Sequence, residues 1–275
     1  MSHSSPIPAL HFLLGELPIE AVLHIRTLGL FHNIWSNPNT NVFRIGLYIL
    51  MMRKENSTTW FHHIQLLCMT YGLPEPLLLM QTSPPLNKSD WNDMVKTRVT
   101  AWHERRLRLL SAPNSKMKYL NVELQGLTGR PHPALSKILN VQDVRKVRAH
   151  LKFLTLDFHH LQESPGQSSY CCLCHEDISC TVEHLIATCR VTLDIRSRMF
   201  PELVNVLASV WPNCQFLEYP PPPKILLQFI LDPTSFNLPN DVRLPILCPN
   251  LDEVFRVSRD WCYAILMLYK RSNVP

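Results

Sequence analysis

The chain has 275 residues, of which 46% are hydrophobic and 18% charged, and its 27 basic and 22 acidic residues give a formal net charge of +5. This composition is typical of a folded protein of one to two domains and excludes an intrinsically disordered tail. The charge excess permits a nucleic-acid partner but does not require one.

Proline and glycine usage indicates the fold class. The chain contains 23 prolines but only seven glycines, so the residue that tight hairpins and phosphate-binding loops need is scarce. Prolines instead separate runs of apolar residues at helical spacing. We therefore expect an all-α, multi-helix bundle.

Cysteine content and apolar run lengths bear on the cellular compartment. Nine cysteines, an odd number, favour reduced thiols and metal binding over a disulfide framework, which predicts an intracellular protein. The longest apolar run, residues 261–269, is too short to span a bilayer, and the N-terminal residues lack a signal-peptide pattern. We expect no membrane association.

Taken in chain order, the apolar periodicity predicts a series of helices after an irregular segment at residues 1–14. Pro18 is expected to open the first helix, Ser57 and Ser89 to cap two later ones, and Pro201 to break another. The predicted helices span residues 19–35, 41–54, 57–71, 90–110, 141–157, 182–190, 192–211, 225–231 and 251–270.

One motif carries chemistry. Cys171, Cys174, His184 and Cys189 follow the spacing C-x2-C-x9-H-x4-C. Two thiolates on one tight turn, joined by a His and a Cys from a short helix, can complete the tetrahedral coordination that structural zinc requires. We predict that these four residues bind a zinc ion and form a small zinc-knuckle insertion in the helical bundle.

Other readings of this segment remain open. Buried cysteines beside a core histidine are the non-metal reading. Cys172, His175 and Cys180 lie in the same segment, and either of the last two can replace His184 as a ligand. In a straight α-helix, five residues carry Cys189 about 140° past alignment with His184, so this helix must loosen if both are ligands.

The motif also resembles a known family. The pattern C-x-x-C followed by Glu183, His184, Leu185 and Cys189 is similar to the zinc-binding region at the C-terminus of non-LTR (LINE-type) retrotransposon reverse transcriptases. The likeness covers roughly residues 10–210. It includes the segments GELPIE at 15–20, HIRTL at 24–28, KYLNV at 118–122, RPHP at 130–133 and HLKFL at 150–154.

The resemblance implies a role beside an active site that another part of a parent polyprotein supplies. It implies a polymerase domain as a partner, RNA or DNA as a ligand, and a nuclear location. It also implies three parts: residues 1–160 as a helical domain, 161–191 as the CCHC zinc-binding segment, and 192–275 as C-terminal helices with proline-rich linkers.

Two basic clusters are candidates for phosphate contact, since each neutralised phosphate adds salt-dependent affinity. An ordinary solvated helix face is the competing reading. The candidate residues are Arg98, Arg105, Arg106, Arg108, Lys116 and Lys118 in the first cluster and Arg145, Lys146, Arg148 and Lys152 in the second.

No catalytic motif is apparent. The sequence has no Asp-Asp dipeptide for two-metal polymerase chemistry, no phosphate-binding glycine loop, no G-x-S-x-G and no H-E-x-x-H. The endonuclease signature that follows the knuckle in some related elements is also missing. We expect a non-enzymatic, zinc-binding module that assists RNA or DNA binding; the alternative is a zinc-stabilised protein-interaction module without nucleic-acid binding.

Overall fold

The computed structural model describes residues 6–37, 41, 45–46, 59–81, 86–122, 126–127, 129–157, 170–171, 173–210, 222–235 and 251–272. Within these ranges all regular structure is helical and there is no strand, which confirms the all-α prediction. The chain divides into two compact units, Glu16–Leu109 and a larger unit made of Met1–Gly15 with Leu110–Pro275. The predicted three-part division stays a prediction.

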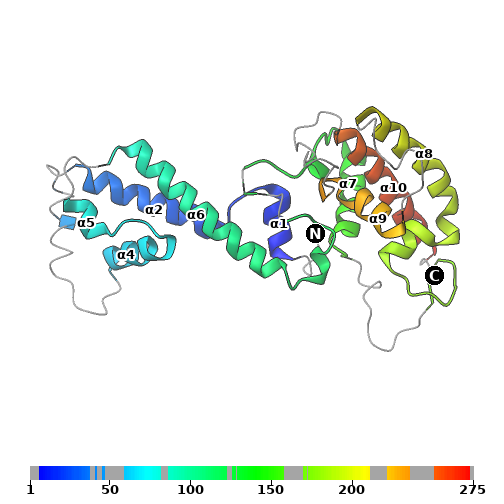
Figure 1. Cartoon of the computed structure of the whole chain (residues 1–275), viewed down its shortest axis with the longest axis horizontal. Coiled ribbons are helices and arrows are strands. Elements are labelled where there is room, and N and C mark those ends of the chain that lie inside the picture. Colours follow the sequence, from blue (N-terminus) through cyan, green and yellow to red (C-terminus); the bar gives the residue numbers. More distant parts are fainter. Residues whose placement is uncertain are drawn as a thin grey trace. The chain divides into compact units, whose positions relative to one another are not determined.

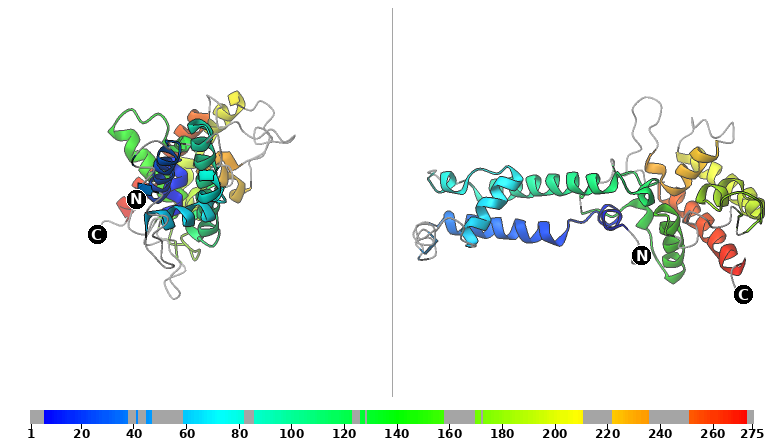
Figure 2. Two further views of the ribbon diagram at one scale, coloured as in Figure 1. Left: turned by 90° about the vertical axis from the view of Figure 1, so that its left-hand side faces the viewer. Right: turned by 90° about the horizontal axis from the view of Figure 1, so that it is seen from below.

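The Glu16–Leu109 unit is formed by α2 (Ile19–Trp35), α4 (Trp60–Tyr71), α5 (Pro76–Gln81) and most of α6 (Lys88–Ser111). Figure 2 shows the long helices α2 and α6 running side by side. They are tied at two levels, by the hydrogen bond from Trp91 Nε1 to the Leu28 carbonyl (3.0 Å) and by the Arg106–Glu20 ion pair (3.2 Å).

The core of this unit is aromatic. Phe31, Trp35, Phe61 and Trp91 are all buried, and the ring of Phe31 lies 6.1–6.3 Å from the other three. Such rings bury large apolar areas; Phe31 is stacked on Trp35 and tilted against Phe61 and Trp91. They hold α2, α4 and α6 together.

Two helix starts differ from the prediction. The N-cap of α4 is Thr59, whose hydroxyl accepts from the His62 amide (3.3 Å), while Ser57 and most of the predicted helix 41–54 lie outside the described residues. Ser89 is inside α6, and Asn87 Oδ1 accepts its amide (3.0 Å). At both helix starts a residue two positions from the predicted one, Thr59 or Asn87, accepts the amide hydrogen bond with the same kind of side-chain oxygen.

The larger unit contains five α-helices among its described residues, together with short 3-10 and π turns. Figure 1 shows α10 running between α7 and α8, against both of which it packs. The helices are α1 (Ile7–Leu14), α7 (Val141–Leu154), α8 (Leu193–Val210), α9 (Pro223–Leu231) and α10 (Leu251–Ser272).

The prediction of an irregular segment at residues 1–14 is wrong, because α1 occupies Ile7–Leu14. Its prolines lie at the N-cap and in the first turn, where no intrahelical amide is needed, and its Phe12 and Leu13 are buried. Gly15 ends it with φ +68°, and a Cβ there would meet the Arg130 carbonyl oxygen at 2.0 Å. The sequence pattern was too short to be recognised as amphipathic.

Pro201 does not break α8, contrary to prediction. The missing amide would have bonded to the carbonyl of Ser197, and both residues are exposed, so water can hydrate that carbonyl. The predicted bounds of α8, α9 and α10 otherwise agree with the structure within two residues.

Helix α7 begins with a capping box formed by Asn140 and Asp143 and ends at Leu154, three residues before the predicted end. Leu156 has φ +48°, a left-handed conformation that stops the helix. The turn positions Asp157 at the C-terminal end of α7.

His150 on α7 makes the stability of the larger unit pH-dependent. Its Nε2 donates to the Leu231 carbonyl (2.9 Å), and burial, together with nearby His132, lowers its pKa to about 4. The unfolded chain, with a His pKa of about 6.5, binds more protons in this window. Stability is therefore fully present above about pH 6.5 and decreases as the pH falls to about 4.

We expect His150 to contribute about 3 kcal/mol of unfolding free energy at pH 7 that is lost by about pH 4. Urea unfolding across this range measures the loss. His150→Gln, which cannot titrate, should flatten the curve, and an unchanged pH slope in this variant would contradict the assignment. The pKa of Asp232 is lowered from 3.8, so the protonation of this carboxylate occurs at a lower pH than that of His150.

Candidate metal centre

The first pair of candidate ligands lies on a tight turn. The amide of Leu173 donates to Cys171 Sγ (3.4 Å), and the amide of His175 donates to the Cys171 carbonyl (2.9 Å). His175 adopts φ +57°, which reverses the chain directly after Cys174. Both cysteine sulfurs are thereby held on the inner side of one turn, where both residues are buried.

The second pair lies on a π-helical turn, His184–Thr188. The amide of Cys189 donates to the His184 carbonyl five residues earlier (2.7 Å), and Thr181 caps the turn by accepting the His184 amide (3.1 Å). A π turn is wider than an α turn and returns residue i+5 toward residue i. It removes the misalignment expected for an α-helix and brings His184 and Cys189 to one side.

The four side chains converge in space as the spacing predicts. Their ligand atoms lie within 4.8 Å of one another, with 4.0 Å between Cys171 Sγ and Cys189 Sγ and 3.4 Å between Cys174 Sγ and His184 Nε2. A tetrahedral zinc site with bonds of about 2.0–2.3 Å requires ligand separations of about 3.5–3.8 Å. The donor set fits a metal ion of this size after small adjustments.

The orientation of His184 is fixed by a neighbour on the same turn. Its Nδ1 lies 3.0 Å from Thr188 Oγ1, which can accept a hydrogen bond from it. That bond places the ring proton on Nδ1 and leaves the Nε2 lone pair directed at the cluster. The i, i+4 spacing of His184 and Thr188 is a signal that sequence reasoning missed.

Arg196 from α8 supplies a positive charge next to the cluster. Its Nη1 donates to the Cys189 carbonyl (2.6 Å) and to Thr192 Oγ1 (2.7 Å). Three thiolates around a divalent cation leave a net charge of −1, which a nearby guanidinium offsets. This contact joins the second ligand pair to α8 and could not be read from the local motif.

Burial disfavours the ionised form of each ligand. It raises the pKa of the Cys171, Cys174 and Cys189 thiols and lowers the pKa of His184. Metal ligands are thiolates and neutral imidazole, so binding of a cation releases the thiol protons. Without a bound cation the three buried thiols are therefore protonated and unreactive, in contrast to reactive surface thiols.

The alternative ligands are placed outside this cluster. His175 is exposed and Cys180 is half-buried, and neither belongs to the set of converging ligand atoms. Cys172 lies outside the described residues. None of the six described cysteines forms a disulfide.

The predicted phosphate-contacting residues divide into several groups. On α6, Arg98 and Arg105 are exposed, whereas Arg106 pairs with Glu20 (3.2 Å) and Arg108 lies 4.0 Å from Glu104. Solvent-exposed ion pairs of this kind typically contribute little to the free energy of folding. Among the α6 candidates, Arg98 and Arg105 are thus the exposed ones for which no ion pair is described.

The remaining candidates belong to the larger unit. Lys118 lies 4.8 Å from the Tyr119 ring, and Lys116 adjoins it in the turn Ser115–Met117. On α7, Lys146 is neutralised by Asp260 (2.6 Å). Arg145, Arg148 and Lys152 are brought together along one cavity.

No single described helix is both long and apolar enough to cross a membrane, although the bent pair Ile7–Leu14 and Ile19–Trp35 reaches that length and apolarity together. Comparison of the chain with protein-family models, with curated proteins and with solved structures finds no match. The chain is therefore described by its architecture, an all-α protein with a buried Cys3His cluster that can hold a metal ion.

Proposed function

We propose that this chain is a non-catalytic, zinc-stabilised helical module that assists binding of RNA or DNA. The observation that carries the proposal is the buried cluster of Cys171, Cys174, His184 and Cys189. Four protein ligands leave no coordination position for a substrate, so the ion has a structural role.

Zinc is the metal that the donor set favours. Thiolate sulfur is a soft ligand and selects against magnesium, calcium and manganese, which prefer oxygen. A tetrahedral arrangement of three sulfurs and one imidazole suits zinc, which has no geometric preference of its own. The ion would hold the turn at Cys171 and Cys174 against the π turn at His184–Thr188.

The nucleic-acid part of the proposal depends on the exposed cations and on the resemblance to LINE-type reverse transcriptases. Under this proposal the polymerase domain of a parent polyprotein supplies the chemistry, and this module holds template RNA or target DNA nearby in the nucleus. The absence of an Asp-Asp dipeptide and of other catalytic motifs from the sequence agrees with a non-enzymatic role.

A salt titration of binding tests this function. We expect the zinc-loaded chain to bind single-stranded RNA and duplex DNA at low salt, with log K falling linearly as log salt increases. The slope is about −0.7 per phosphate contacted on a single strand and about −0.9 on a duplex. A chain that contains zinc but binds neither ligand at low salt would contradict the proposal.

An exposed apolar surface favours the alternative, a protein-interaction module. Leu139, Val141 and Val144 at the start of α7 are 85%, 71% and 52% exposed. Contiguous exposed apolar residues mark protein-binding surfaces more often than nucleic-acid surfaces. Co-purification of a protein partner that Val141→Asp abolishes, together with absent nucleic-acid binding, would favour this second function.

A further inference from the structure

A cationic cavity of about 400 Å³ lies between α7 and α10. Arg145, Arg148 and Lys152 line it from α7, and Tyr263, Met267 and Lys270 line it from α10. Pockets for small ligands have volumes of about 300–1,000 Å³, so this cavity can hold a group of nucleotide size.

Helix geometry explains why these residues meet. The α7 residues are spaced i, i+3 and i+7 and the α10 residues i, i+4 and i+7, so each set lies along one face of its helix. The ion pairs Lys137–Asp252 (3.1 Å) and Lys146–Asp260 (2.6 Å) align α7 and α10 in the same direction. The cavity follows these pairs toward the C-terminal ends of both helices.

The positive charge in this cavity is not balanced by its lining. Asp260 lies before the cavity on α10 and is already bound by Lys146 (2.6 Å) and approached by Arg256 (3.6 Å). The described lining of the cavity contains no carboxylate. Arg145, Arg148 and Lys270 place three like charges around one hollow, where they repel one another and an anion relieves that repulsion.

Helix dipoles account for only part of this arrangement. Lys152 and Lys270 lie in the last turns of their helices, where the negative end of the dipole favours cations. Arg145 and Arg148 lie in the interior of α7, beyond the reach of that effect. The helix dipole therefore does not explain their position in the cavity.

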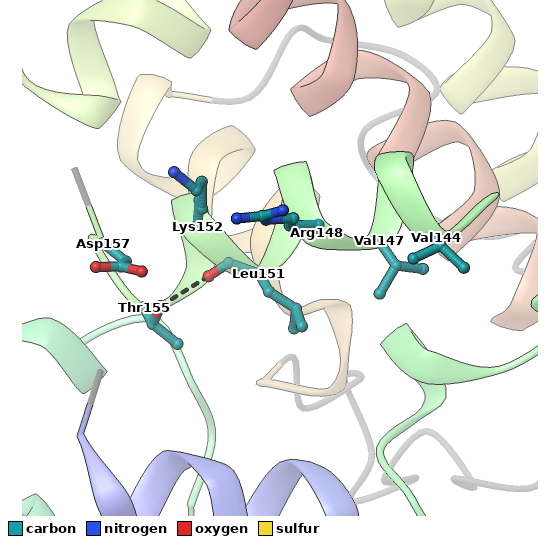
Figure 3. Close-up of a pocket in the computed structure, with 7 residues that line it drawn as sticks. All are labelled: Val144, Val147, Arg148, Leu151, Lys152, Thr155 and Asp157. Carbon is teal, nitrogen blue, oxygen red and sulfur yellow. Dashed lines mark hydrogen bonds between the residues drawn. The ribbon is translucent and has the colours of Figure 1, made fainter. Parts of the chain in front are cut away.

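Arg148 and Lys152 also border a second cavity, of about 460 Å³. Figure 3 shows these two side chains projecting from one side of α7, while Val147 and Leu151 project from the other. The second cavity thus adds an apolar wall next to the cationic pair. Asp157 lines this second cavity and is absent from the lining of the first.

We propose that the α7–α10 cavity binds a phosphate ester of a nucleotide unit, with Arg145, Arg148 and Lys270 contacting phosphate oxygens and Tyr263 offering its ring to the adjoining base. Arginine matches phosphate geometry by donating two parallel hydrogen bonds, and aromatic side chains bind bases without sequence preference. This inference rests on the proposed function and names the phosphate-binding site within it.

The test compares two variants that lose the same charge. Arg148→Gln with Lys270→Gln removes two cavity cations, and the control Arg198→Gln with Lys224→Gln removes two exposed cations elsewhere in the larger unit. Binding of a short single-stranded RNA is measured against salt concentration. Helicity and zinc content are checked first, so that a misfolded variant is recognised.

We expect the cavity variant to bind RNA at least about tenfold more weakly at low salt, with the slope of log K against log salt reduced by about 1.4, the value for two phosphate contacts on a single strand. The control should retain most of its affinity. Equal loss in the two variants would overturn the cavity assignment and leave the proposed function standing.

A second ligand separates failure of the cavity from failure of the function. If the unmutated chain binds no RNA, the proposed function is wrong. Calorimetric titration of the unmutated chain with pyrophosphate then tests the cavity alone. Pyrophosphate binding that is lost in the cavity variant and kept in the control would support a site for a free phosphorylated molecule. If the folded, unmutated chain does not bind pyrophosphate, the inference is overturned.

Discussion

The double variant Cys171→Ser, Cys174→Ser is expected to lose bound zinc and to unfold the segment from Tyr170 to Thr192. Structural zinc contributes about 10 kcal/mol or more to the folding of small zinc-binding peptides, and two of its four ligands are removed here. The remaining local contacts, a tight turn and one π turn, are too few to hold this segment.

The effect should extend to packing but not to helix content. Leu185 and Ile186 on the π turn are buried and this turn contacts α8, α9 and α10. Their release should expose apolar surface and lower the melting temperature of the larger unit. Far-UV helicity should remain mostly intact, because α7 and α8 still pack against α10 and the Glu16–Leu109 unit has a separate core.

Metal analysis and hydrogen exchange measure this result. Rapid amide exchange in the segment 173–192, with slow exchange retained in α2 and α6, is the expected pattern. Cys180→Ser is the matched control, since Cys180 lies outside the converging ligands, and it should keep its zinc. Full retention of zinc by the double variant would refute the ligand assignment.

The second large effect is expected for Asp232→Ala. Asp232 is fully buried after α9 and accepts hydrogen bonds from the Asn121 amide (2.8 Å) and the Thr234 amide (3.1 Å). His132, also fully buried, lies with Nε2 3.5 Å from its Oδ1. These contacts, with His132 the main favourable one, lower the pKa of Asp232 against the effect of burial, so the group is ionised at neutral pH.

Removing this carboxylate leaves several buried donors without an acceptor. Each buried donor left unsatisfied costs about 1–3 kcal/mol, so a total loss of about 3 kcal/mol is expected when the turns at Asn121, His132 and Thr234 lose their common anchor. Denaturant unfolding should show that the free energy of unfolding of the larger unit is lowered by this amount. Asp194→Asn, at an exposed position in the first turn of α8, is the control and should cost less than about 1 kcal/mol. Similar small costs for both variants would contradict the anchoring role.

The local parts of the fold could be predicted from sequence. Apolar periodicity located α2, α7, α8 and α10, and cysteine spacing identified the four residues that converge. These signals are local, because one helix turn or one tight turn fixes them. The predicted zinc ion itself and the nucleic-acid partner stay predictions.

The remaining features depend on contacts between distant residues. In an α-helix, His184 and Cys189 would point in different directions, and the π turn brings them to one side. Arg196 reaches the cluster only because α8 folds back on it. The sequence presented Lys146 as one of four similar cations on α7. Its pairing with Asp260, and the arrival of Lys270 beside Arg148, are set by the packing of α10.

Metal analysis of the purified full chain, expressed in zinc-containing medium, is the most direct test of the zinc centre. We predict one zinc ion per chain, lost together with the ordered structure of the segment around His184 when a strong chelator is added. A stably folded chain that carries no zinc, and whose His184–Thr188 turn is protected from exchange without any metal, would contradict the proposal.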